Sequence, residues 1–168
     1  MFNHPIRIRP ANPDDCQQIF DFICELAEFE NLRHEVSGSA QQLQESLFGA
    51  QPYAEVLIAE YQQQAAGFAL FFHNYSTFLT QPGIYLEDLF VKPQFRSFGI
   101  GQALLVRLAE IARERDCGRL EWWVLDWNKR AAEFYRRLGA EAMDDWLVYR
   151  LSGDALDQLA ATSSPSPN

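Results

Sequence analysis

The sequence predicts a single α/β domain in which helices flank a central mixed, mostly antiparallel sheet. The chain has 168 residues, a length that suits one domain. Strand-like runs that read as a hairpin come first, and a strand–loop–helix–strand–helix unit follows them. That unit needs a crossover connection, which adds a parallel pair to the sheet. We expect residues 1–162 to form one domain and residues 163–168 to form a flexible tail.

The order of the expected elements is β-α-α-β-β-β-α-β-α-β, followed by a short terminal helix. Strands are recognised by alternating or continuous apolar runs, and helices by apolar residues three and four positions apart. We expect strands at 6–9, 54–61, 66–74, 83–91, 120–125 and 146–151, helices at 13–30, 40–48, between the loop 96–101 and Cys117, from Asn128 to Leu138 and at 154–161, and a loop at 75–82.

Several residues are of the types that begin and end helices. Asn12 and Ser39 precede apolar periodic segments and are expected to accept hydrogen bonds from free backbone N–H groups. Asn128 is placed in the same way before a later helix, and Gly139 follows that helix where a left-handed residue is favoured. The three glutamines at 62–64 lie between two apolar runs and indicate a hairpin turn.

The composition argues against several functional classes. The net charge of −9 repels nucleic acid and anionic membranes, and we expect neither as a partner. The same charge is compatible with a cationic substrate, although on charge alone solubility is the favoured explanation. Three cysteines without a CxxC pair and a polar N-terminus without a signal peptide indicate a reducing, cytoplasmic location. The histidines are scattered without metal-ligand spacing, so no metal is expected.

The segment 86–101 carries the pattern that is most informative about function. A strand ends there, a loop turns, and Gly99 and Gly101 lead into a helix. The first N–H groups of a helix lack internal partners and lie at the positive end of its dipole, so they bind phosphate groups. Arg96 adds a positive charge. Glycines before a helix are often only a turn, and the pattern is neither a dinucleotide fingerprint nor a P-loop.

Two motifs in sequence order resemble those of a known family. Arg96-x-x-Gly99-x-Gly101, after a Val-x-Pro strand end, resembles the acetyl-CoA signature of the GNAT N-acetyltransferase superfamily. The downstream run from Asn128 through Tyr135 to Ala140 resembles the second hallmark of that superfamily. The resemblance extends from Ile6 to Leu151. It implies a GNAT-like sandwich fold and an enzyme that uses acetyl-CoA to acetylate an amine.

Three shorter segments, at 25–30, 85–91 and 98–101, are similar to the diamine/polyamine branch of the superfamily, which includes thialysine acetyltransferases. The relatives in that branch are homodimers, so a homodimer is expected here. Ser97 stands where the branch usually has glycine, and Phe29 stands where it usually has tyrosine. The loop 75–83 lacks the acidic residues that help polyamine enzymes to bind a cationic tail. The resemblance therefore supports the reaction more than polyamine specificity.

The resemblance also implies which residues contact acetyl-CoA. Backbone N–H groups at the end of the central strand would stabilise the oxyanion of acetyl transfer, and the loop and two later residues would bind the rest of the molecule. The implied set is Leu89, Phe90, Val91, Arg96, Ser97, Phe98, Gly99, Ile100, Gly101, Gln102, Asn128 and Tyr135.

Two of the residues are candidates for proton transfer. An alkylammonium must lose a proton before it attacks, at a cost of about 5 kcal/mol at pH 7. Glu87 is the candidate general base, through water, and the alternative is a solvent-facing residue on a strand edge. Tyr135 matches the general acid of the family, and the alternative is a core tyrosine. Glu30, Glu87 and Asp88 are the candidates for holding the substrate's cationic groups.

These inferences favour direct attack of a small cationic amine, such as a diamine, a polyamine or a thialysine-like amino acid, in a ternary complex. An aminoglycoside would suit the same acidic pocket. A protein N-terminus or lysine is the alternative substrate, and a sensor that binds acetyl-CoA without turnover is the alternative from another class. The presence of both Glu87 and Tyr135 argues against the sensor.

Overall fold

The computed structural model describes residues 6–162, which divide between Trp123 and Val124 into two compact units that we describe separately. The first holds β1 Ile6–Pro10, α1 Cys16–Phe29, α2 Ala40–Phe48, β2 Glu55–Tyr61, β3 Gln64–Ser76, β4 Gln81–Val91, α3 Ile100–Glu114 and β5 Leu120–Trp122; the second holds α4 Lys129–Arg137 and α5 Gly153–Ala161. A single domain over residues 1–162 stays a prediction, and the expected tail lies outside the described residues.

The five strands form one sheet in the order β1-β2-β3-β4-β5. The first four strands pair antiparallel with their neighbours, whereas β5 runs parallel to β4. A parallel pair needs a crossover, and α3 provides it. The expected mixed, mostly antiparallel sheet is therefore confirmed.

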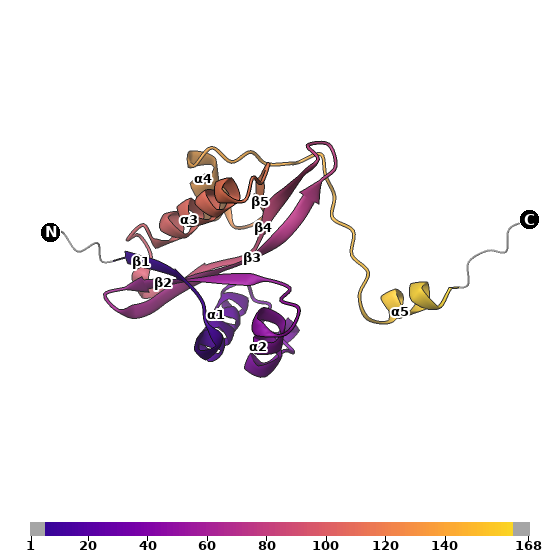
Figure 1. Ribbon diagram of the computed structural model, residues 1–168, viewed down its shortest axis with the longest axis horizontal. Coiled ribbons are helices and arrows are strands. Elements are labelled where there is room, and N and C mark those ends of the chain that lie inside the picture. The colour runs from indigo at the N-terminus through magenta and orange to yellow at the C-terminus, as the bar shows by residue number, and fades with distance from the viewer. Residues whose placement is uncertain (1–5, 163–168) are drawn as a thin grey trace, which may run out of the picture. The chain divides into compact units, whose positions relative to one another are not determined.

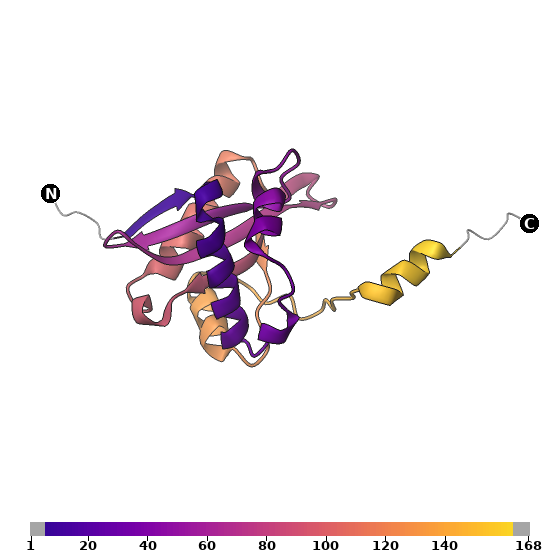
Figure 2. The same cartoon turned by 90° about the horizontal axis from the view of Figure 1, so that it is seen from below.

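Helices cover both faces of this sheet in the first unit. Helices α1 and α2 lie against one face and α3 lies against the other (Figure 1). Seen from the side of α1 and α2, α1 crosses the strands (Figure 2). Phe22 of α1 stacks on Phe68 of β3 with ring centroids 5.6 Å apart, and both rings belong to the buried core on this face. On α3 the predicted apolar stripe is buried: Leu104, Leu105, Leu108, Ile111 and Ala112.

The predicted helix caps are present. The Asn12 side chain accepts a hydrogen bond from the Asp14 N–H at 2.9 Å, and Asp15 accepts one from the Asn12 N–H at 2.8 Å. This reciprocal pair closes a 3-10 turn, so the α-helix itself begins at Cys16. Ser39 caps α2 by accepting from the Gln42 N–H at 3.2 Å.

Both hairpins are tighter than the sequence indicates. Gln62 and Gln63 have φ angles of 50° and 68°, so a two-residue turn joins β2 to β3 and confirms that hairpin. The bounds expected for the loop at 75–82 are wrong. The β3–β4 pairing continues to Ser76–Gln81, so the loop has only the four residues 77–80. Polar residues at the ends of a strand resemble a loop in sequence, although their backbones still pair.

The last two predicted strands are corrected by the structure. β5 stops at Trp122 instead of residue 125, and residues 146–151 have no regular secondary structure. In that segment Tyr149 is 90% exposed. A strand is stable only when a neighbour satisfies its backbone groups, and the described part of the second unit contains no strand with which this segment pairs. Alternating apolar residues alone therefore do not make a strand here.

None of the helices within residues 6–162 combines the length and the apolar character that crossing a lipid bilayer requires.

Candidate active site

Glu87 lies at a β-bulge in β4. Leu86 pairs with Phe71 and Asp88 pairs with Leu70, so two steps along β4 match one step along β3 and Glu87 is the additional residue. Its side chain is exposed. A bulge bends its strand and redirects the side chain at that point, which suits a residue that exchanges protons with solvent.

Three carboxylates predicted to bind substrate interact here. Asp88 is half-buried on the sheet face that α1 covers, and Glu30 directly follows α1 as its C-cap residue. Burial, followed by the charges of Glu87 and Glu30, raises the pKa of Asp88 to about 6. Burial also raises the pKa of Glu30. The negative charges of Glu30 and Glu87 act on Asp88, and such closely placed negative charges favour a bound cation. We call Glu30, Glu87 and Asp88 the acidic cluster.

Glu28, two residues before Glu30, lies on a solvated face of α1. The side chain is exposed, and its nearest ion-pair partner in the described chain is Arg33 at 4.0 Å.

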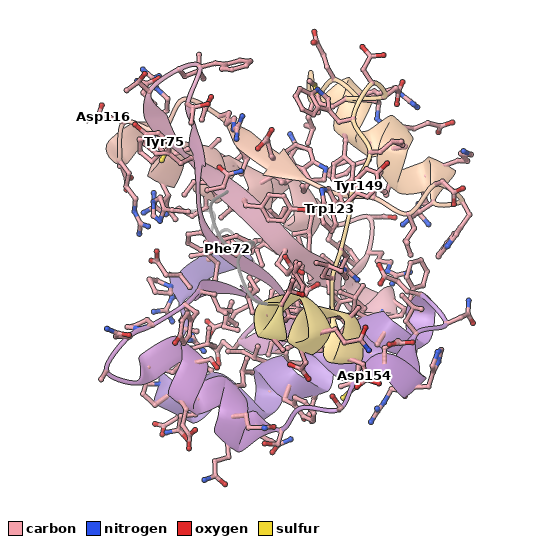
Figure 3. All side chains as sticks on the ribbon, turned by 90° about the vertical axis from the view of Figure 1, so that its right-hand side faces the viewer. Phe72, Tyr75, Asp116, Trp123, Tyr149 and Asp154 are labelled. Carbon is pink, nitrogen blue, oxygen red and sulfur yellow. The ribbon has the colours of Figure 1, made fainter. Side chains whose placement is uncertain are left out.

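A row of three aromatic rings runs from β3 across β4 to the residue that follows β5. Phe72 of β3 and Tyr85 of β4 lie 5.2 Å apart between ring centroids, and Tyr85 lies 5.7 Å from Trp123. Tyr85 thus lies between the other two rings, Phe72 and Trp123, which are labelled in Figure 3. Trp123 follows β5 and is 56% exposed. Sequence analysis did not identify this row, because residues far apart in the chain become neighbours only through the pairing of β3, β4 and β5.

One edge of β4 lacks a second strand beside the bulge. The pairs between β4 and β5 end at Leu86–Trp122, so within residues 6–123 the segment from Glu87 to Val91 pairs only with β3. Phe90 points into the core, 6.0 Å from Phe22, and its side chain is buried. Leu89 and Val91 are half-buried. This open edge is where the sequence predicts donors for an oxyanion.

The loop after β4 has the backbone expected of an anion-binding turn. Ser97 and Gly99 have φ angles of 71° and 84°, both in the left-handed region. The first helical bond runs from the Ala103 N–H to the Gly99 carbonyl at 2.9 Å, so the N–H groups of residues 100–102 precede the hydrogen-bonded turns of α3. Ile100 is buried and anchors the helix, while Ser97 and Phe98 are exposed.

Phe98 and Arg96 attach this loop to the rest of the first unit. Phe98 stacks on Tyr61 of β2 with ring centroids 4.9 Å apart. The Arg96 Nε–H donates to the Val91 carbonyl at 3.0 Å, and its guanidinium lies 4.9 Å from the centre of the Phe29 ring. Sequence analysis identified Arg96 but missed Phe29 as its partner, because the two residues are far apart in the chain.

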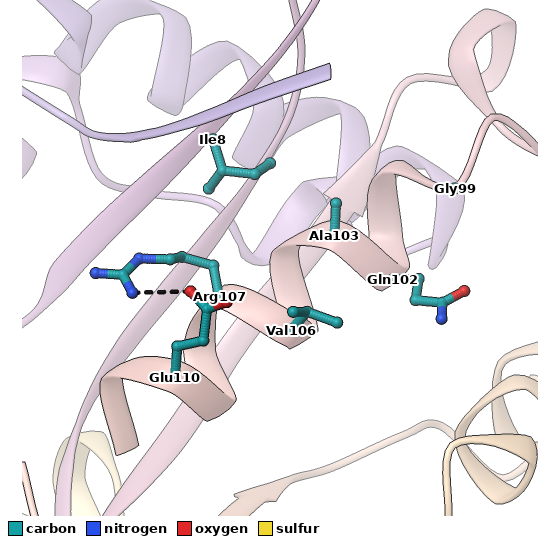
Figure 4. A pocket seen from close by; sticks show the side chains of 7 residues that line it. All are labelled: Ile8, Gly99, Gln102, Ala103, Val106, Arg107 and Glu110. Atoms are coloured by element: carbon teal, nitrogen blue, oxygen red, sulfur yellow. Dashed lines mark hydrogen bonds and ion pairs between the residues drawn. The ribbon is translucent and has the colours of Figure 1, made fainter. Parts of the chain in front are cut away.

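An open groove of about 430 Å³ begins at this loop and follows the exposed side of α3 (Figure 4). Arg107 and Glu110 form an ion pair at its far end, with N and O atoms 2.9 Å apart. The sequence analysis named two of the lining residues, Gly99 and Gln102. Four of the other five lining residues, Ala103, Val106, Arg107 and Glu110, are linked by helical spacing, which would have identified them. The fifth, Ile8, belongs to β1 and is brought to the groove only by the tertiary structure.

The remaining two predicted site residues belong to the second unit. Asn128 caps α4, since its side chain accepts a hydrogen bond from the Ala131 N–H at 3.2 Å. Gly139 has a φ of 90°, and Ala140 N–H donates to the Tyr135 carbonyl at 3.1 Å, which ends the helix as expected. Tyr135 is half-buried, with Phe134 5.4 Å away between ring centroids. The predicted site residues with numbers up to 102 therefore all belong to the first unit. Asn128 and Tyr135 belong to the second unit.

Residues 6–162 contain no group of three or more His, Cys, Asp or Glu side chains that could hold a metal ion. A reaction without metal stays a prediction.

A family model and several curated relatives match the sequence of this chain. The family model described as Acetyltransferase (GNAT) family matches residues 20–140. A thialysine N-epsilon-acetyltransferase of Mus musculus is 39% identical over 165 residues, which cover 92% of this chain and 96% of the relative. An L-ornithine N5-acetyltransferase of Arabidopsis thaliana is 30% identical and covers 91% of this chain and 87% of its own.

Solved structures share the fold. An integron cassette protein from the mobile metagenome of V. cholerae is 26% identical, with a TM-score of 0.79 over 94% of this chain and 99% of that chain. An aminoglycoside acetyltransferase from an uncultured soil metagenomic sample is 18% identical, with a TM-score of 0.74 over 90% of this chain and 100% of its own. At that identity the likeness concerns the fold alone.

Proposed function

The chain belongs to the GNAT acetyltransferase family and is an N-acetyltransferase, and on this premise we propose that it transfers the acetyl group of acetyl-CoA to a primary amine of a small cationic molecule. The amine is a diamine, a polyamine or a thialysine-like amino acid. It attacks the thioester directly, in a ternary complex. Homodimer formation, which the sequence resemblance implies, and a cytoplasmic location, which the cysteine pattern favours, are part of the same proposal.

The acidic cluster is the observation that supports a small cationic amine as the substrate. Glu30, Glu87 and Asp88 are close enough for the first two to raise the pKa of the third, and each would be stabilised by a nearby ammonium group. A thialysine-type or diamine substrate carries a second charged group as well as the reacting amine. The names of the relatives agree with this class, since they act on thialysine or ornithine.

The residues of the α3 loop fit the phosphates of acetyl-CoA. A phosphate accepts hydrogen bonds from several N–H groups at once, and those of residues 100–102 precede the first helical bond. Gly99 has no atom within 4 Å of the position that a Cβ would occupy, so the approach to this backbone is open. The Arg96 guanidinium adds charge beside the same turn. Bound acetyl-CoA supplies an acetyl thioester to the site.

The chemistry of the chain's own residues follows from their positions. Glu87, exposed at the bulge, would take the proton of the attacking amine through water. Asp88, when ionised, would hold the ammonium group. The N–H groups of Leu89–Val91, beside the open edge of β4, would bind the thioester oxygen as negative charge develops on it. Tyr135 would donate a proton to the departing thiolate.

The first experiment measures CoA release from acetyl-CoA with putrescine, spermidine, lysine, thialysine, an aminoglycoside or a short peptide as acceptor. The wild type is expected to turn over one of the small amines. Tyr135→Phe is expected to lose about 100-fold or more in kcat while still binding CoA, which is typical for loss of a general acid. Tyr53→Phe, an exposed tyrosine outside the proposed site, is the matched control and is expected to behave as the wild type.

Two outcomes decide between the alternatives. Turnover of the peptide alone would favour a protein substrate. Tight CoA binding without turnover of any acceptor would contradict the small-amine proposal and favour a sensor of acetyl-CoA.

A further inference from the structure

Arg96 joins the ends of two other elements to the proposed acetyl-CoA loop. Its Nε–H donates to the carbonyl of Val91, the last residue of β4, at 3.0 Å. Its guanidinium carbon lies 4.9 Å from the ring centre of Phe29, the last residue of α1. The hydrogen bond holds the Nε edge of the guanidinium, and the ring lies against the same group. Together the two contacts restrict where this cation lies.

The loop behind Arg96 needs such an anchor. Between Arg96 and the buried Ile100, both Ser97 and Gly99 adopt left-handed backbone conformations. Ser97 is exposed, so burial of its side chain does not hold it in that conformation. A loop that is ordered before its ligand arrives binds more tightly, because it loses less conformational entropy on binding. The Arg96 contacts fix the N-terminal end of the loop, and Ile100 fixes the other end.

We propose that Phe29 is a positioning residue for acetyl-CoA binding: its ring holds the Arg96 guanidinium, and through it the loop that leads into α3. This inference rests on the proposed function and adds to it a residue from α1, outside both sequence motifs of the family. Phe29 itself touches neither the acetyl group nor the phosphates in this role. Its effect is on affinity for CoA and acetyl-CoA, and not on the rate of the chemical step.

The chain offers a matched control for Phe29. Phe48 is also the last residue of a helix, α2, and is 36% exposed compared with 43% for Phe29. Truncation of either ring to leucine therefore changes a half-exposed aromatic residue at a helix end. In the described structure only Phe29 of these two has a guanidinium over its ring.

The experiment measures the dissociation constant for CoA by titration calorimetry and the kinetics of the acetyl transfer. Phe29→Leu is expected to weaken CoA binding about 2- to 5-fold, the range for a partly exposed cation–aromatic contact. It is expected to raise the KM for acetyl-CoA by a similar factor and to leave kcat at saturation unchanged. Phe29→Tyr keeps the aromatic face and is expected to bind as the wild type does, as is Phe48→Leu.

A double-mutant cycle with Arg96→Gln separates positioning from general loss of stability. If Phe29 acts through Arg96, then Phe29→Leu has no further effect on CoA affinity in the Arg96→Gln background. Additive losses would overturn the inference, as would equal weakening by Phe29→Leu and Phe29→Tyr, or unchanged affinity in Phe29→Leu. Failure of the wild type to bind CoA would instead overturn the proposed function, and this inference with it.

Discussion

Replacement of Asp88 by asparagine is expected to stabilise the protein near neutral pH while it weakens amine binding. The pKa of Asp88 rises from 3.8 to about 6 on folding. At 1.36 kcal/mol for each tenfold change in proton affinity, the ionised carboxylate costs the folded state about 3 kcal/mol. The residue is partly exposed, and solvent screening reduces this figure to about 1–2 kcal/mol.

The direction of the pH dependence follows from the raised pKa. Above pH 6 Asp88 is ionised in both states and the full cost applies. As the pH falls from 6 towards 3.8, the folded state takes up a proton that the unfolded state does not yet bind, so the cost declines. The wild type should therefore gain stability relative to Asp88→Asn between pH 7 and pH 4.

Urea unfolding of both proteins at pH 4, 5.5, 7 and 8 measures this difference. At pH 8 the variant should be more stable by about 1–2 kcal/mol, which corresponds to a rise in Tm of roughly 2–8 °C for a chain of this length. Glu141→Gln removes an exposed carboxylate in the second unit and serves as the control, with an expected effect within about 0.5 kcal/mol.

The same variant tests the proposed role of Asp88 in binding the substrate. If the ionised carboxylate holds an ammonium group, the KM for the amine rises in Asp88→Asn, and in the wild type it rises as the pH falls below about 6. A stability difference that does not change with pH, or a variant less stable than the wild type at pH 8, would show that burial of this charge does not oppose folding.

Three further substitutions are expected to change the stability of the fold. Gly99→Ala should lower stability by about 1–2 kcal/mol through backbone strain alone, since φ is 84° and no atom lies within 4 Å of the added Cβ; a Tm equal to the wild type's would refute this. Ser97→Gly, at a φ of 71°, should raise stability by up to about 1 kcal/mol in urea unfolding, and a lower midpoint would contradict it. Asp15→Asn should cost about 1–3 kcal/mol at pH 7, because Arg9 lies 2.7 Å from Asp15 and lowers its pKa. The lowered pKa makes that stability present above pH 4 and lost in acid, so an equal cost at pH 2 would argue against it.

Much of the fold was predictable because local rules determine it. Asn12 and Ser39 are cap residues at the expected helix starts, and the apolar stripe of α3 is buried as its spacing predicts. The absence of a strand at 146–151 was not predictable in this way. The alternating apolar pattern of this segment is compatible with a strand, but a strand also needs a neighbour that pairs with its backbone.

The sequence by itself determined the family, the prediction that the loop at Arg96–Gly101 binds an anion, and the choice of candidate acids and bases, because each depends on residue types at short spacing. Only the tertiary structure decided that Glu87 occupies a bulge, which requires the register between β3 and β4. It also decided that Glu30 and Asp88 share one electrostatic environment and that Phe29 lies against Arg96. These contacts join the end of α1 to β4 and to the loop after it, and the physical reason is that packing α1 on the sheet, which no local pattern specifies, brings them together.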